Sequence, residues 1–342
     1  MTRRRLSQRQ IERIKAIQER RRAHLAARCE QALAECEAET LPEEGVVLVQ
    51  HGLNLLVEDA QGRLARCLAR QNLGEIVCGD RVIWQRLPDG QGVVIALLPR
   101  TTVFNRLDAE GRERPLVANL SRLLILIAPE PEPSVLLIDQ YLLAAECSGI
   151  VPILVANKMD LLAEPSEHAE FQGQFAHYAA IGYRIFWVSA RHPASLAPLI
   201  QELIDQTSVL VGQSGVGKSS LVKALLPDRE IQIGRLSEAT GLGRHTTSAA
   251  TCYRLPQGGW IIDSPGVRRF RLGHIDRQAV EWGFREFRDH AGLCRFNNCR
   301  HLEEPGCAIR QAVAAGRISP LRLASFHRLL EDCERQALPG GT

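Results

Sequence analysis

The sequence has few lysines and no long apolar run. Only four of its 42 basic residues are lysines, so the other 38 are arginines. The longest apolar run, from Leu123 to Ala128, is far shorter than the roughly 20 residues that a membrane-spanning helix needs. The N-terminal residues are rich in Arg and Gln and lack the apolar segment of a secretory signal. We therefore expect a cytoplasmic protein that has no membrane partner.

The length and composition predict a globular protein of several domains. A chain of 342 residues is longer than one that folds around a single ordinary hydrophobic core, so two or three domains are expected. The composition, 45% hydrophobic and 24% charged, is typical of globular proteins. Six of the ten cysteines are scattered without a pattern, and three others lie near one histidine. In the cytoplasm these thiols are expected to be reduced.

Residues 1–44 form a basic arm. Up to position 28 the arm has ten basic and two acidic residues, a local charge of +8, whereas the whole chain carries +3. Helix-forming residues dominate, and Ile11, Ile14 and Ile17 recur at roughly helical spacing. The arm is therefore predicted to be helical or disordered. Its charge suits the phosphates of a nucleic acid, and a merely solvated, frayed helix is the alternative.

Between Gly45 and Leu98 the sequence consists of short β-like runs separated by turn residues. The runs are Val46–Val49, Leu53–Val57, Leu64–Ala69, Arg81–Gln85 and Val93–Leu97. They predict a small β-barrel over residues 45–103, for which the oligonucleotide-binding (OB) fold is the commonest form and an SH3-like barrel the alternative. Trp84 is the only Phe, Trp or Tyr residue in this region, so the sequence shows no row of aromatic side chains on which bases could stack. Nucleic-acid binding by the barrel and a purely structural or docking role therefore both stay open.

Strands and helices alternate after Arg106. The runs Arg122–Ala128, Val151–Ala156 and Tyr183–Val188 read as buried strands of a parallel sheet. Helices are expected over Ser134–Cys147, Phe171–Ala180 and Leu196–Asp205. This alternation predicts a doubly wound α/β domain over residues 104–275, with its ligands at the carboxyl ends of the strands.

A phosphate-binding loop follows the next apolar strand, Val209–Val211, and opens a helix. Its glycines let backbone N–H groups turn toward a polyphosphate at the helix N-terminus. Lys218 adds positive charge for the β- and γ-phosphates, and the Ser219 hydroxyl can ligate Mg²⁺. The loop predicts a nucleoside triphosphate bound with Mg²⁺. The residues expected to bind it are Gly212, Gln213, Ser214, Gly215, Val216, Gly217, Lys218, Ser219 and Ser220.

A second motif predicts that the base is guanine. Asp160 can accept two hydrogen bonds from guanine N1–H and the exocyclic amine, a donor pair that adenine lacks. The motif, Asn157-Lys-Met-Asp160, stands at the end of one buried strand. The pair Ser189-Ala190 at the end of the next strand can pack against the base. We therefore expect GTP and GDP as ligands, whereas a metabolic ATP-dependent kinase would not need Asp160. The expected base-binding residues are Asn157, Lys158, Met159, Asp160, Ser189 and Ala190.

Two further segments are expected to sense the γ-phosphate. Asp263 ends a buried strand and is placed to hold Mg²⁺ through water, while the N–H of Gly266 meets the phosphate. In the glycine-rich segment 241–247, we expect Thr247, rather than Thr246, to close onto Mg²⁺.

The residue after Gly266 is Val267, whereas Ras-like enzymes have a water-orienting Gln there. Slow intrinsic hydrolysis is therefore predicted. His245, Arg268, Arg269 or a group from RNA could complete the site, and a non-catalytic His245 is the alternative. The expected catalytic set is His245, Thr247, Asp263 and Gly266.

Four soft metal ligands lie within 14 residues near the C-terminus: Cys294, Cys299, His301 and Cys307. Three thiolates and one imidazole predict a closed, structural zinc site with one Zn²⁺ per chain. Ordinary buried cysteines are the alternative, because the spacing is not that of a Cys-x₂-Cys knuckle. Helices are expected over Ala308–Ala315 and Leu321–Gln336, so residues 276–342 are predicted to be a helical zinc-binding domain.

In a Ras-like G domain the phosphate loop precedes the base-reading motif. Here the base-reading motif comes first, so the order of the motifs is circularly permuted. The permuted order, the Gly-Arg-His-Thr-Thr segment, Asp-Ser-Pro-Gly, the barrel and the Cys₃His segment together resemble the bacterial circularly permuted GTPases of late small-subunit maturation. The resemblance covers residues 45 to 335, and the family more often has Thr where this chain has Ser264.

The resemblance implies an OB-fold barrel and GTP hydrolysis on the small ribosomal subunit. The partners it implies are that subunit and its rRNA, and we expect a monomer. A GTP-regulated adaptor that binds a protein partner is the alternative.

Overall fold

The structure is a computed structural model that describes residues 41–51, 54–70, 73–88, 90–107, 112–230, 232–233, 236, 250–263 and 276–337. Residues 1–40 of the basic arm, His245, Thr247 and the segment 264–275 with Gly266 and Val267 lie outside the described residues. Two compact units can be distinguished: residues 1–100 with 230–252, and residues 101–229 with 253–342. The two units are described separately, and the domain boundaries given above stay predictions.

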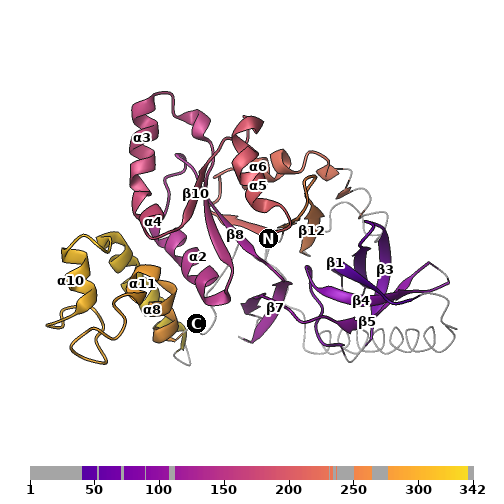
Figure 1. The fold of residues 1–342 in the computed structure, drawn as a ribbon, viewed down its shortest axis with the longest axis horizontal. Coiled ribbons are helices and arrows are strands. Elements are labelled where there is room, and N and C mark those ends of the chain that lie inside the picture. Colours follow the sequence, from indigo (N-terminus) through magenta and orange to yellow (C-terminus); the bar gives the residue numbers. More distant parts are fainter. Residues whose placement is uncertain are drawn as a thin grey trace, which may run out of the picture. The chain divides into compact units, whose positions relative to one another are not determined.

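The first unit contains a closed five-stranded barrel (Figure 1). The strands pair in the order β1-β2-β3-β5-β4, and β4 also pairs with β1, which closes the barrel. The β3–β5 pair is parallel and the other pairs are antiparallel. The strands are β1 (Glu43–His51), β2 (Asn54–Asp59), β3 (Leu64–Ala69), β4 (Arg81–Arg86) and β5 (Gly92–Leu97). Five strands closed in this way form an OB-like barrel, so the predicted β-barrel is confirmed.

The interior of the barrel is tightly packed around Trp84, which is fully buried. Gly92 is required beside it, because a Cβ atom there would lie 2.6 Å from the Trp84 ring and 2.5 Å from Cys67 Sγ. One buried charge, Asp80, is paired: its carboxylate accepts a hydrogen bond of 2.7 Å from Arg100 Nε. Burying a charge is tolerated when it is paired in this way.

The second unit begins with a β-hairpin that the sequence pattern does not predict. Strands β6 (Val103–Leu107) and β7 (Glu113–Ala118) pair antiparallel as a two-stranded sheet. Phe104 and Val117 are buried in it. Charged residues and Pro115 interrupt the apolar alternation of both strands, which removes the usual sequence signal.

A parallel sheet forms the centre of the α/β domain (Figure 1). Its order is β10-β9-β8-β11-β13, and every neighbouring pair is parallel. A further strand, β12 (Thr251–Arg254), leads into β13 through a turn at 255–259. Because the strands run in one direction, the motifs at their carboxyl ends meet at one edge. The five central strands are β8 (Arg122–Ile127), β9 (Val151–Ala156), β10 (Arg184–Trp187), β11 (Thr207–Gly212) and β13 (Trp260–Asp263).

Helices connect these strands as the alternating pattern predicts. Ser134 caps the first helix by accepting a hydrogen bond from the N–H of Leu137, and Gly149 ends it in the left-handed conformation. The helix predicted over Phe171–Ala180 is instead two helices, and the first begins earlier, because Pro165 and a capping box start it. The helices are α2 (Val135–Ser148), α3 (Pro165–Gln174), α4 (Ala176–Ala180), α5 (Ala197–Leu203) and α6 (Lys218–Leu225).

Four helices complete the second unit: α8 (Arg277–Gly283), α9 (Arg285–Arg288), α10 (Ala308–Ala314) and α11 (Pro320–Ala337). The predicted α10 and α11 are confirmed, whereas α8 and α9 are too short to show a helical period. Their core contains Phe284, Phe287 and Phe326 and continues onto Leu143 of α2. None of the described helices is long and apolar enough to cross a membrane.

A buried arginine joins these helices to the sheet domain. Arg322 of α11 is 1% exposed, and its guanidinium lies 2.6 Å from Asp139 of α2 and 2.6 Å from Glu286 of α9. Asp139 also accepts a hydrogen bond of 2.7 Å from the hydroxyl of Tyr178. A buried charge is stable only with such partners, so the three elements are held in one arrangement.

Candidate functional site

The phosphate loop has the backbone conformation that its glycines predict. Gly212, Gly215 and Gly217 have φ angles of 133°, 88° and 88°, a region that other residues rarely adopt. A Cβ atom at Gly212 would lie 2.4 Å from the carbonyl oxygen of Leu126, and one at Gly217 would lie 2.4 Å from Asn157 Nδ2. The loop therefore depends on glycine both for its turns and for close packing.

Lys218 and Gln213 are fixed within the loop. The Lys218 ammonium donates hydrogen bonds to the carbonyl oxygens of Gly212, at 2.7 Å, and Gln213. The side chain of Gln213 accepts a hydrogen bond of 3.1 Å from the N–H of Ser134, just before α2. Of the other predicted loop residues, Val216 is buried, while Ser214, Gly215, Ser219 and Ser220 are exposed. The positive charge of Lys218 and the N-terminus of α6 therefore lie together at the phosphate loop.

Asn157 connects the base-reading motif to the phosphate loop. It follows β9 and is buried, and its amide Nδ2 donates a hydrogen bond of 3.0 Å to the carbonyl oxygen of Val216. Its Oδ1 accepts one of 3.1 Å from the N–H of Ala190. Three segments that are distant in sequence therefore meet at this side chain.

The Asp160 carboxylate is held in an ionised state. Ser189 Oγ donates a hydrogen bond of 2.5 Å to it, and this bond is the main reason why the pKa of Asp160 lies below its ordinary value. Arg191 lies 3.4 Å from the other carboxylate oxygen and supports the same shift. An ionised carboxylate accepts hydrogen bonds only, which is what the donor edge of guanine requires.

Lys158 lies beside the same loop in a left-handed conformation, with φ of 62°. Its ammonium donates a hydrogen bond of 3.0 Å to the carbonyl oxygen of Glu130. Met159, the next residue, is buried. The structure thus brings all six predicted base-binding residues to one end of the sheet.

Ser219 and Asp263 supply oxygen atoms near the phosphate loop. Ser219 lies exposed in the first turn of α6. Val209 of β11 is opposite Ile262 of β13, so Asp263 ends the strand beside the one that leads into the loop. Mg²⁺ takes oxygen ligands and keeps several waters, and a hydroxyl and a carboxylate at one sheet edge fit it. The third predicted Mg²⁺ residue, Thr247, is in the part of the chain that is not described.

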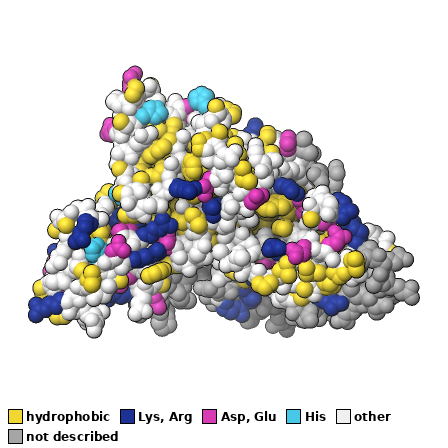
Figure 2. Space-filling model, in the orientation of Figure 1, with side chains coloured by type: hydrophobic (Ala, Val, Ile, Leu, Met, Phe, Trp, Pro, Cys, Tyr) yellow, Lys and Arg dark blue, Asp and Glu magenta, His cyan; other side chains and the backbone are white. Residues whose placement is uncertain are grey.

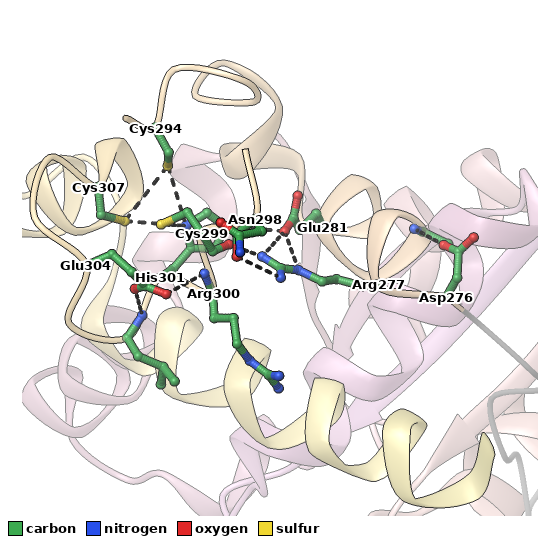
Figure 3. A network of polar contacts seen from close by, with 12 residues as sticks. Asp276, Arg277, Glu281, Cys294, Asn298, Cys299, Arg300, His301, Glu304 and Cys307 are labelled. Carbon is green, nitrogen blue, oxygen red and sulfur yellow. Dashed lines mark hydrogen bonds and ion pairs between the residues drawn. The ribbon is translucent and has the colours of Figure 1, made fainter. Parts of the chain in front are cut away.

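The four predicted metal ligands converge in the C-terminal helical region (Figure 3). His301 Nδ1 lies 3.6 Å from the sulfurs of Cys294 and Cys299 and 3.3 Å from that of Cys307. The sulfurs of Cys294 and Cys307 are 4.0 Å apart. Zinc–ligand bonds of about 2.0–2.3 Å in a tetrahedron place ligand atoms about 3.5–3.8 Å apart, so the four atoms fit such an ion. The predicted convergence is confirmed.

A shell of polar contacts surrounds this cluster (Figure 3). Glu281 of α8 lies 3.4 Å from His301 Nε2, on the side of the ring opposite the cysteines. Arg277 donates hydrogen bonds of 3.0 Å to Glu281 and also bonds to the carbonyl oxygen of Cys299. The Glu304 carboxylate accepts hydrogen bonds from the N–H groups of Arg300 and Leu302, and these bonds lower the pKa of Glu304 to about 2. Helix α8 and Glu304 therefore fix the loop that carries the ligands.

Comparisons with known proteins agree with this arrangement. The family model of the RsgA GTPase matches residues 97–273. A protein of Azotobacter vinelandii named small ribosomal subunit biogenesis GTPase RsgA is 47% identical over 336 residues, 96% of this chain and 98% of that protein. A Pseudomonas aeruginosa protein of the same name is 46% identical over 332 residues, with the same shares covered. This chain belongs to the RsgA GTPase family.

Solved structures support the permuted order of the motifs in this RsgA-family chain. The circularly permuted GTPase YloQ has a TM-score of 0.71 and 25% identity, covering 89% of this chain and 99% of YloQ. YjeQ from Thermotoga maritima also has a TM-score of 0.71, with 28% identity, covering 86% of this chain and 99% of YjeQ. The predicted family and the predicted permutation are both confirmed.

The RsgA-family motifs do not identify all the residues that shape the site. The Ser195 hydroxyl oxygen accepts a hydrogen bond of 2.9 Å from the backbone N–H of Ser189. Arg229 lies 2.6 Å from Asp263, and Glu281 lies beside His301. None of these residues belongs to a spaced motif, so no sequence signal distinguishes them from ordinary polar residues.

Proposed function

We propose that this chain is a GTPase that binds the small ribosomal subunit and assists its late maturation. The observation that carries the proposal is the contact between Asn157 and Val216, which joins a guanine-reading loop to a phosphate loop. The relatives named above supply the biological setting, since their names state small-subunit biogenesis. Such a protein works in the cytoplasm, and we propose that it does so as a monomer.

In the proposed complex, Asp160 accepts hydrogen bonds from the guanine edge, while Ser189 and Ala190 line the base. Lys158 lays its stem along the base plane, and Asn157 and Met159 support the loop. The residues from Gly212 to Ser220 enclose the phosphates through their N–H groups and Lys218. Ser219 and Thr247 hold Mg²⁺ directly, and Asp263 holds it through water.

Hydrolysis transfers the γ-phosphoryl group of GTP to water and releases GDP and phosphate. Gly266 is proposed to contact the γ-phosphate, and His245 to orient the attacking water, because Val267 cannot. The basal rate is then slow, and the ribosomal subunit completes the site.

The Cys₃His cluster is proposed to hold one structural Zn²⁺. Four protein ligands leave no open coordination position, so the ion stabilises the loop and does not take part in hydrolysis. Its fit rests on the spacing of the four ligand atoms.

The surface around this cluster supports a role in rRNA binding. Trp282 and Phe296 are 60% and 41% exposed, and arginine side chains stack on both of them. Figure 2 shows basic, acidic and apolar side chains interspersed over the C-terminal helices. Exposed aromatic rings and guanidinium planes are the groups on which unpaired bases stack.

The decisive measurement is the GTPase rate with and without purified small subunits. We expect at least a ~10-fold stimulation, which corresponds to roughly 1.4 kcal/mol of barrier. The GTP-bound form should bind subunits more tightly than the GDP-bound form, because only the γ-phosphate can hold closed the two segments that contain Thr247 and Gly266. His245→Ala should lower the stimulated rate more than the affinity for GTP.

A matched experiment separates RNA binding from the adaptor alternative. Removal of residues 1–40 should weaken subunit binding and flatten its salt dependence, with nucleotide affinity unchanged. An equal subunit affinity in GTP and GDP, without stimulation of hydrolysis, would reject the ribosomal function and favour a GTP-regulated adaptor.

A further inference from the structure

Arg229 forms an ion pair with Asp263 at the edge of the proposed nucleotide site. The guanidinium Nη2 lies 2.6 Å from Asp263 Oδ2, and the two side chains are 24% and 25% exposed. Arg229 follows α6, the helix that begins at the phosphate loop, and Asp263 ends β13. The contact therefore links the segment after α6 to β13, the strand that pairs with β11 beside the loop.

The surroundings of Arg229 hold its guanidinium against this carboxylate without fully satisfying it. The guanidinium lies over the ring of Tyr253, with 5.2 Å between its carbon and the ring centroid. Its backbone N–H bonds to the carbonyl oxygen of Leu226, which fixes the turn after α6. Its Nε is buried and has no hydrogen-bond partner among the described residues. An unsatisfied buried donor is unfavourable, so its cost offsets part of the stabilisation that the ion pair contributes.

Arg229 and Mg²⁺ both require the negative charge of Asp263. A guanidinium at hydrogen-bond distance neutralises the carboxylate and repels a divalent cation that approaches it. A hydrated Mg²⁺ binds a carboxylate through hydrogen bonds from its waters, and at Asp263 those waters would meet a carboxylate that Arg229 already contacts.

We propose that Arg229 occupies, in the nucleotide-free protein, the place at Asp263 that the hydrated Mg²⁺ of a bound nucleotide takes. Arg229 thereby stabilises the empty site and sets the Mg²⁺ concentration at which nucleotide is retained. This inference rests on the proposed nucleotide site and adds a residue that governs its occupancy.

The test compares wild type with Arg229→Gln, which removes the charge and keeps a polar side chain of similar reach. Dissociation of a fluorescent GDP is followed while Mg²⁺ is varied. We expect the Mg²⁺ concentration for half-maximal retention to fall about fivefold, or about 1 kcal/mol, the size of a partly exposed ion pair. Arg229→Lys should stay close to wild type, because it keeps the positive charge.

Thermal unfolding provides a second readout. Arg229→Gln should lower the melting temperature of the nucleotide-free protein and leave that of the Mg²⁺·GDP complex unchanged. A merely structural arginine would stabilise both forms. Arg184→Gln is the matched control, since Arg184 pairs with Glu202 at the opposite end of the sheet, and it should not change the Mg²⁺ dependence.

An unchanged or increased Mg²⁺ requirement in Arg229→Gln would overturn the inference, as would equal destabilisation of both forms. These results differ from a failure of the proposed function. If wild type does not bind the labelled GDP at saturating Mg²⁺, the nucleotide site itself is wrong.

Discussion

The side-chain amide of Asn157 lies between two loops and bonds to both: Nδ2 donates to Val216 across 3.0 Å, and Oδ1 accepts from Ala190 across 3.1 Å. The residue is 1% exposed. The contacts hold the phosphate loop and the loop of Ala190 in one arrangement.

Replacement of Asn157 by Ala should weaken GDP and GTP binding by about 10- to 100-fold. The change leaves the buried carbonyl of Val216 and the part-buried N–H of Ala190 without their Asn157 partner, at about 1–3 kcal/mol. Titration with a fluorescent nucleotide measures this loss. Asn54→Ala, in the barrel, is the control and should bind normally; equal affinities in the two variants would contradict the assigned role.

Asp160→Asn should weaken GTP binding by several kcal/mol and shift preference toward xanthosine nucleotides. Xanthine has a carbonyl where guanine has the amine, and the mutant amide supplies the missing donor. Calorimetry with both nucleotides tests this exchange. An unchanged GTP affinity would show that Asp160 does not read the base.

Glu281→Gln should lower zinc affinity by about 10- to 100-fold, because a carboxylate on the outer nitrogen fixes the orientation of a ligating histidine. Competition with a colorimetric chelator measures the affinity. Glu331→Gln, an exposed carboxylate on α11, is the control and should bind zinc normally.

Wild type should contain one zinc per chain by elemental analysis. Cys299→Ser should destabilise the C-terminal region, since metal binding stabilises the folded loop. A fully retained fold after exhaustive chelation would argue against a structural ion.

Arg322→Met should destabilise the protein by about 3–5 kcal/mol, because it leaves Asp139 and Glu286 buried without their counter-ion. Arg328→Met is a matched control on the same helix, where the arginine is 59% exposed and pairs with Glu331 at 4.0 Å. It should change stability by less than about 1 kcal/mol. Urea unfolding of both variants makes the comparison.

The free energy of unfolding should fall between pH 7.5 and 5.5, in part through His177. Burial is the main cause that lowers the pKa of this half-buried imidazole below 6.5. As the pH falls through about 6.5, His177 therefore binds a proton in the unfolded chain before it does so in the folded chain. This difference lowers the free energy of unfolding by up to about 1.4 kcal/mol per pH unit. His177→Gln should show a smaller fall over the same range, and an identical slope would reject this contribution.

The sequence predicts the residues of the binding motifs better than it predicts the residues that hold those motifs in place. Asn157, Asp160, Lys218 and the four metal ligands carry chemistry that needs particular residue types at particular spacings, and the structure brings them together. The five barrel strands follow from turn residues and apolar runs.

Arg229, Glu281 and Arg322 could not be predicted in this way. Each is one charged residue among many, and its role depends on a partner that only the folded chain supplies. The same limit explains why the β6–β7 hairpin is not predicted. Pro115 and charged residues interrupt the apolar alternation of its strands, and only the pairing of the two strands in the fold reveals them.

The pairing of Arg322 with Asp139 has a consequence for the order of biosynthesis. The two residues are 183 positions apart, and the arginine lies in the last helix. As the chain leaves the ribosome from its N-terminus, α2 is complete long before its counter-ion exists. A chain that ends before α11 therefore lacks the counter-ion of Asp139, and the ion pair that joins α2 to α11 forms only once this helix has been made.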